Sequence, residues 1–95
     1  MTGSERSSSG LDARRRKLLF RSWHRGMREM DLIFGSFADA RIETLTDAEL
    51  DQYEKLLDIS DTALLPLATG EQPIPPGDEH EFLQKIVAFR RTVKF

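Results

Sequence analysis

Apolar residues recur at helical spacing along the chain, and this periodicity limits the possible folds more than any other feature of the sequence. Between residues 28 and 43, five of them fall at i, +3, +4, +7 and +8: Met30, Ile33, Phe34, Phe37 and Ala38. Such a stripe is wide enough to be buried along one side of a helix. No segment alternates apolar and polar residues with the period of two that a half-buried strand shows. The sequence therefore predicts an all-α domain.

Capping and stop signals divide this pattern into five short helices, which we expect to pack as one compact bundle. Thr46 and Glu49 have the spacing of a capping box, and so do Asp78 and Glu81. Gly26 stands where a helix commonly ends in a left-handed residue. The helices are predicted at 12–24, 28–43, 47–58 and 61–69, and from 79 into the basic residues that follow. Residues 1–11 are predicted to be a disordered tail, and residues 12–95 the five-helix domain.

Three residues within this helical pattern need an explanation. Gly35 interrupts the second predicted helix and costs about 1 kcal/mol relative to alanine, unless a neighbouring helix approaches closely there. Pro66 lacks the donor for a bond back to Thr62, so the fourth helix is expected to be kinked or 3₁₀-like. Trp23 lies one turn from Leu19, which favours a place in the core over one at an interface.

The length of the chain limits what it can enclose. A 95-residue domain buries roughly 60 to 65% of the surface that its unfolded chain exposes, so little core is left for a substrate pocket. The sequence has no cysteine, which excludes disulfides, thiolate zinc sites and thiol catalysis. Its apolar runs are far shorter than the roughly 20 residues of a membrane-spanning helix. We therefore expect a cytoplasmic protein whose functional surface is on its outside.

The two signs of charge are segregated along the sequence. Residues 11–28 hold seven basic residues and one acidic residue, whereas residues 29–61 hold ten acidic and two basic ones. This pattern predicts a dipolar molecule that can steer an oppositely patterned protein. The basic run Arg14–Lys17 supports an alternative function as a small nucleic-acid-binding or regulatory module. An isoelectric point near 5.6 and the lack of interleaved aromatic residues favour a solvated helix face instead.

Residues suited to catalysis are few. His24 and His80 are the only histidines, they lie in different predicted helices, and neither has the spacing of a metal ligand pair. The serines gather in the predicted tail, where no fixed group can activate them as nucleophiles. We therefore predict no catalytic residue, no metal site and no enzyme, and a small hydrolase is the weakest of the functional readings.

The corner between the first two predicted helices carries the most specific pattern in the chain. RGxxE, at Arg25, Gly26 and Glu29, is weak by itself. It stands within a longer set made up of Trp23, Arg25, Gly26, Met27, Glu29, Met30, Asp31, Leu32, Gly35, Phe37 and Asp39. This set closely resembles the signature of the SdhE family of FAD assembly factors, also called YgfY, whose mitochondrial relatives are of the Sdh5 type. The resemblance continues through residues 46–57 and the proline connector QPIPP.

This resemblance implies a YgfY-like fold of five helices and an accessory role rather than an enzymatic one. Members of the family bind the flavoprotein subunit of succinate dehydrogenase, or in some bacteria of fumarate reductase, and promote covalent attachment of FAD to it. The cofactor is carried by the partner, so this chain is expected to hold none stably. We also expect it to act as a monomer and to bind neither nucleic acid nor a membrane. The residues expected to bind the partner are Arg25, Gly26, Met27, Arg28, Glu29 and Asp31.

Elementary chemistry suggests how that corner would bind. A glycine lets the backbone of a partner come close where a side chain would collide. Arg25 offers five donors in a planar fork, which suits a carboxylate or a group of carbonyls on the partner. Glu29 is expected either to orient Arg25 or to meet a cation on the partner.

Overall fold

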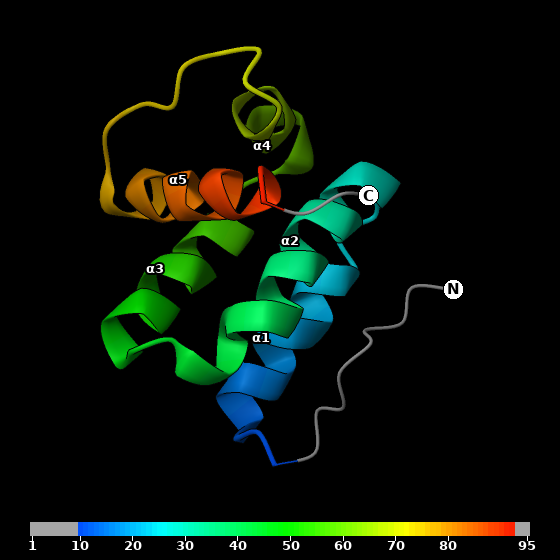
Figure 1. Ribbon diagram of the computed structural model, residues 1–95, viewed down its shortest axis with the longest axis vertical. Helices are drawn as coiled ribbons and strands as arrows, with labels where there is room; N and C mark the ends of the chain where they lie inside the picture. The colour runs from blue at the N-terminus through cyan, green and yellow to red at the C-terminus, as the bar shows by residue number, and fades with distance from the viewer. Residues whose placement is uncertain (1–9, 93–95) are drawn as a thin grey trace.

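The computed structural model describes residues 10–92, and this part of the chain folds into five α-helices joined by loops (Figure 1). They are α1 (Ala13–Trp23), α2 (Arg28–Arg41), α3 (Asp47–Leu57), α4 (Asp61–Ala68) and α5 (Asp78–Arg90), with a 3₁₀ turn, η1 (Ile42–Thr44), after α2. No strand occurs within these described residues, so the all-α, five-helix prediction is confirmed. Most of the predicted disordered tail, residues 1–9, lies outside them. Leu11 was assigned to that tail, but its side chain is buried against the core.

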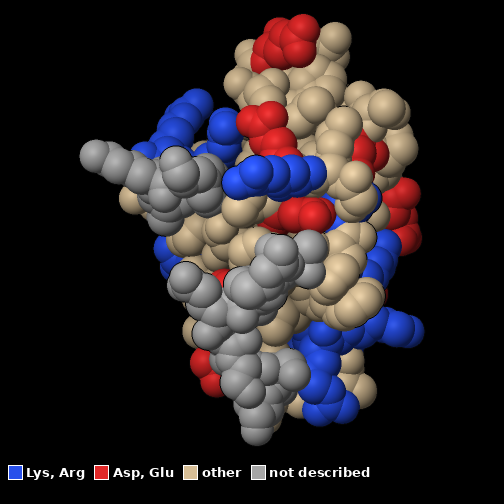
Figure 2. All heavy atoms as spheres, turned by 90° about the vertical axis from the view of Figure 1, so that its right-hand side faces the viewer, with Lys and Arg blue, Asp and Glu red and all other residues tan. Residues whose placement is uncertain are grey.

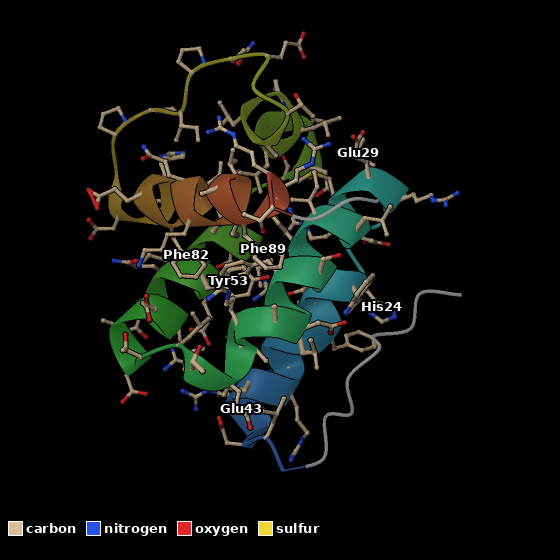
Figure 3. All side chains as sticks on the ribbon, in the orientation of Figure 1. His24, Glu29, Glu43, Tyr53, Phe82 and Phe89 are labelled. Carbon is tan, nitrogen blue, oxygen red and sulfur yellow. The ribbon has the colours of Figure 1, made fainter. Side chains whose placement is uncertain are left out.

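The helices are arranged as two packed pairs with α4 at one end. α1 and α2 run antiparallel side by side, α3 packs against α5, and α2 also contacts α5 (Figure 1). α4 contacts α5, and the proline-rich linker arches from α4 to the start of α5. Tyr53, Phe82 and Phe89 point toward one another between α3, α5 and α2 (Figure 3). The rings of Phe37, Tyr53 and Phe82 pack at edge or tilted angles inside the core, and the partly buried ring of Phe89 packs edge-on against Phe37.

The predicted caps were right at α3 and wrong at α5. Thr46 and Glu49 exchange both hydrogen bonds of a capping box, at 2.9 and 3.1 Å. At α5 the N-cap is Gly77, not Asp78, because the Gly77 carbonyl already accepts the N–H of Glu81 at 2.8 Å. Asp78 thus stands in the first turn, where its charge complements the helix dipole.

Pro66 does not interrupt α4, which is α-helical from Asp61 to Ala68 rather than 3₁₀-like. The proline lies in the last turn of this short helix. It therefore removes a single hydrogen bond near the end of the helix, where the backbone donors and acceptors are already changing partners.

The close approach predicted at Gly35 is present, and its neighbour is Trp23. The indole packs flat against the glycine, so that a Cβ added to Gly35 would lie only 2.3 Å from Cδ2 of Trp23. The indole Nε1 donates to Asp39 Oδ1 at 3.0 Å, which fixes the ring in that position. The absence of a side chain at Gly35 therefore allows α1 and α2 to pack at close distance.

The segregated charges of the sequence meet in the fold. Arg14 of α1 pairs with Asp51 and, at 2.9 Å, with Glu54 of α3, and Arg21 pairs with Asp58 at 2.7 Å. The basic helix and the acidic helix lie side by side, so several charges of opposite sign are paired within the molecule. These pairs are partly exposed, and each one contributes little to stability by itself.

We predict that Gly35→Ala destabilises the protein despite the better helix propensity of alanine. Overpacking costs about 1 to 3 kcal/mol, and an approach of 2.3 Å to the fixed indole places this site in the upper part of that range, above the roughly 1 kcal/mol that alanine gains over glycine in a helix. The measurement is the free energy of unfolding in urea. Ser36→Ala, the neighbouring position on the same helix, is the control and should change stability by no more than about 0.5 kcal/mol. A Gly35→Ala variant as stable as this control would contradict the packing described here.

The Arg14–Glu54 pair predicts a defined pH dependence. Hydrogen bonding from Arg14 lowers the pKa of Glu54 below its ordinary value of 4.5. A carboxyl whose pKa falls on folding stabilises the fold above its unfolded pKa and loses that contribution as the pH drops through its folded pKa. Arg14→Gln should therefore be less stable than wild type at neutral pH, and the difference should shrink well below pH 4.5. Urea unfolding at both pH values measures it, and a difference independent of pH would contradict this assignment.

Candidate functional site

The loop between α1 and α2, residues 24–27, presents an open glycine. Gly26 is exposed and has a φ of +100°, a region that residues with side chains rarely adopt. A Cβ built on Gly26 would meet no other atom within 4 Å. The backbone conformation at position 26 therefore favours glycine, so no side chain projects from the loop there. None of the other described atoms of this chain occupies the space in front of it.

The side chain of Arg25 points inward from the same loop and bonds it to the connection between α3 and α4. Its guanidinium donates to Asp61 Oδ1 at 2.8 Å, and its other two nitrogens donate to the carbonyls of Leu57 and Ile59 at 2.5 and 2.6 Å. The guanidinium carbon also lies 5.3 Å from the ring centroid of Phe34. With 8% of its side chain exposed, Arg25 binds a carboxylate and carbonyls of its own chain, whereas the sequence analysis expected it to offer its donors to a partner.

Asp31 and Met27 stabilise the loop through hydrogen bonds on its inner side. The Asp31 carboxylate accepts the backbone N–H of Arg25 at 2.6 Å. Met27 is the N-cap of α2, its carbonyl accepts the N–H of Asp31 at 2.9 Å, and its partly buried side chain packs against the core. Both residues shape the turn that presents Gly26, and neither is fully exposed.

Arg28 and Glu29 project from the first turn of α2 on the outside of the molecule, beside Gly26. Both are exposed, and Glu29 is seen at the end of α2 that lies near α4 (Figure 3). Glu29 does not orient Arg25. Its carboxylate lies 3.5 Å from Arg90 of α5, the outer limit for a hydrogen bond. The six predicted residues are thus close together but divided: three face outward, and Arg25, Met27 and Asp31 hold them in place.

Sequence reasoning missed two residues of this region, Asp61 and Arg90. Asp61 is 36 positions from Arg25, and Arg90 is 61 positions from Glu29. No local spacing links such pairs, because they meet only when α4 and α5 have packed. The surplus of acidic residues after the basic first helix was the available signal that cross-chain pairing would occur.

The basic run Arg14–Lys17 does not form a free cationic surface. Arg14 is engaged by α3, and Arg15 donates to the carbonyls of Ile42 and Leu45 at 3.0 and 2.6 Å. Arg16 and Lys17 are more exposed, and Arg16 donates to the carbonyl of Leu11 at 2.7 Å. On the face drawn in Figure 2, basic and acidic side chains are interspersed with other residues rather than gathered in one basic area. The run therefore serves largely to join helices, which gives little support to nucleic-acid binding.

The histidines of the described part of the chain are not grouped with other side chains that could bind a metal ion. His24 Nδ1 is 2.7 Å from the carbonyl of Phe20, and His80 Nδ1 is 3.3 Å from that of Pro76, so each is used locally. Among residues 10–92, no group of three or more His, Asp or Glu side chains is placed to hold a metal ion. No helix among them has the length and apolar character needed to cross a membrane.

Comparison with known proteins gives a consistent family assignment. Residues 16–90 match the family model Sdh5, described as flavinator of succinate dehydrogenase. The chain is similar to the FAD assembly factor SdhE of Acetobacter pasteurianus, with 37% identity over 89 residues, covering 88% of this chain and 82% of that protein. No solved structure matches the chain.

Mitochondrial proteins also match this chain. The chain is 30% identical over 90 residues to succinate dehydrogenase assembly factor 2 of Danio rerio and 34% identical over 77 residues to that of Mycosarcoma maydis. The matches cover 93% and 81% of this chain, but 57% and 32% of those two relatives. The chain therefore corresponds to most of the bacterial relative and to one part of these mitochondrial proteins.

We predict that Arg25→Gln costs about 3 kcal/mol of unfolding free energy, because it leaves Asp61 and two carbonyls without their buried charged donor. Arg28→Gln removes the same charge three residues away, from an exposed position, and should change stability by no more than about 0.5 kcal/mol. Urea unfolding of the two variants measures the difference. Equal stabilities would show that Arg25 does not join the two halves of the fold.

Proposed function

The chain belongs to the Sdh5 family, the flavinators of succinate dehydrogenase, and we propose on that basis that the outer side of its α1–α2 loop docks on the flavoprotein subunit of that enzyme. The contact residues in this proposal are Gly26, Arg28 and Glu29. Arg25, Met27 and Asp31 act indirectly, because they hold the loop in the shape that presents the glycine.

Membership of the family makes this chain an assembly factor for flavinylation rather than an enzyme. We place FAD on the partner, as the family description implies for a protein that acts on succinate dehydrogenase. Covalent attachment then takes place between groups of the flavoprotein and its own flavin. A monomer of this chain suffices for that role, since the proposed contact lies on one face of one domain.

The observation that carries the proposal is the combination of an open glycine and a rigid support. Gly26 leaves room for a partner's backbone to approach, and its positive φ gives the loop a shape that other residues adopt only with strain. The bonds of Arg25 to the α3–α4 connection fix this loop relative to the rest of the domain. Such preorganisation reduces the ordering cost of binding, which favours a contact surface.

Docking at this loop would help flavinylation by orientation. Attachment requires a partner side chain and the flavin to be held in a reactive geometry, and holding two groups in place lowers the entropic part of a barrier. A rigid domain bound beside the flavin site can stabilise that geometry without contributing a reacting group. This mechanism needs no catalytic residue in the present chain.

We predict that Gly26→Arg abolishes complex formation with the flavoprotein lacking covalent FAD. The new side chain fills the space that the partner backbone needs. Because φ at position 26 is positive, the substitution also strains the loop by about 1 to 2 kcal/mol. Gly70→Arg is the matched control: Gly70 has a φ of +87° and equally open surroundings, but it lies at the end of α4.

Two readouts complete this test. Binding is measured by calorimetry with the apo flavoprotein, and covalent attachment by in-gel flavin fluorescence of the flavoprotein from cells that express each variant. Gly70→Arg should retain both activities with a similar loss of stability. If Gly26→Arg bound and supported flavinylation as well as Gly70→Arg does, the loop would not be the docking site.

A further inference from the structure

A groove of about 350 Å³ opens beside the proposed docking loop, between the first turns of α2 and the last turn of α5. Its lining consists of Arg28, Glu29, Leu32, Ile33 and Arg90. Two of these residues, Arg28 and Glu29, are already contact residues in the proposed function. The groove has an apolar floor formed by α2, with charged groups around it.

Arg90 is poorly satisfied where it stands. Its Nε is buried and has no hydrogen-bond partner, and its Nη2 reaches Glu29 only at 3.5 Å. Arg25, by contrast, uses three nitrogens in bonds of 2.5 to 2.8 Å. A buried guanidinium N–H without an acceptor is costly, and most such groups in proteins are paired. With 32% of its side chain exposed, Arg90 can be reached, and it can turn toward a better acceptor.

The charge around the groove indicates what that acceptor would be. Two arginines and one glutamate leave a net positive charge at the rim. A guanidinium pairs most strongly with a carboxylate, because two parallel N–H groups match its two oxygens. The apolar floor from Leu32 and Ile33 suits an aliphatic or aromatic side chain placed next to that carboxylate.

We propose that this groove receives a surface segment of the flavoprotein in which an acidic side chain stands next to an apolar one, and that Arg90 pairs with that carboxylate. The inference rests on the proposed function, since it extends the same docking face from α2 onto α5. In this arrangement Arg90 exchanges its long contact with Glu29 for a charge-assisted pair across the interface, and the apolar neighbour covers Leu32.

The first test compares Arg90→Gln with Arg91→Gln in calorimetric binding to the apo flavoprotein. Both variants remove one positive charge from the end of α5, but Arg91 is exposed and does not line the groove. We expect Arg90→Gln to weaken binding about tenfold or more and Arg91→Gln less than about twofold. The loss from Arg90→Gln should shrink as salt is added, because the pair is ionic. Equal effects of the two substitutions, or a loss insensitive to salt, would overturn the proposal.

The second test separates a direct contact from an effect through Glu29. In a double-mutant cycle, Arg90→Gln is measured in wild type and in the Glu29→Gln background. If Arg90 meets the partner itself, most of its loss persists when Glu29 is neutral. If Arg90 merely orients Glu29, its loss disappears in that background, and the proposed pair with the partner is wrong. Thermal melting of each variant confirms that it is folded.

The outcomes also distinguish this inference from the proposed function. Failure of the wild-type chain to bind the flavoprotein, or full binding by Gly26→Arg, would contradict the docking loop. Wild-type binding that is lost in Gly26→Arg but equally retained in Arg90→Gln and Arg91→Gln would leave the docking loop standing and reject the groove alone.

Discussion

The bonds of the Arg25 guanidinium are the interaction on which the rest of the structure depends. They join the end of the α1–α2 pair to the connection between α3 and α4, through Asp61 and two backbone carbonyls. A buried arginine is tolerated only when its donors are used, and here three nitrogens have close acceptors while the guanidinium lies over Phe34. The loop that follows is therefore fixed from within, and it can be exposed without being loose.

This arrangement divides the residues of the family signature between two tasks. Trp23, Gly35 and Asp39 act together, because the indole lies on the glycine and donates to the aspartate. Arg25 and Asp31 set the loop. Gly26 and Glu29 of the signature are exposed, as is their neighbour Arg28, and these three are the residues that we propose contact the partner. A residue of a binding motif can thus matter by holding the surface rather than by forming it.

The sequence predicted the helices well because their signals are local. The apolar stripe of α2, the capping box at Thr46 and the need for a close neighbour at Gly35 all depend on residues within a few turns or on one steric rule. The roles of Arg25 and Arg90 could not be predicted in this way. Their partners lie 32 to 61 positions away, so the direction in which each side chain points is decided by tertiary packing. Even the N-cap of α5 differs by one residue from the prediction: it is Gly77, whose φ of +139° is rare for residues with a side chain.

The ion pairs made by α1 and by Arg25 of the following loop also bear on how a partner would be recognised. A chain with strongly segregated charges would attract partners over long range, but Arg14, Arg21 and Arg25 meet acidic residues of the following helices inside the fold. The paired charges act mainly at short range, so in the proposed contact we expect local fit to contribute more to selectivity than these charges do. The residues able to do so lie where an open glycine, an exposed Glu29 and the incompletely bonded Arg90 come together at one end of α2. Because this corner is fixed from within by Arg25 and open on its outer side, it meets both requirements of the proposed contact surface.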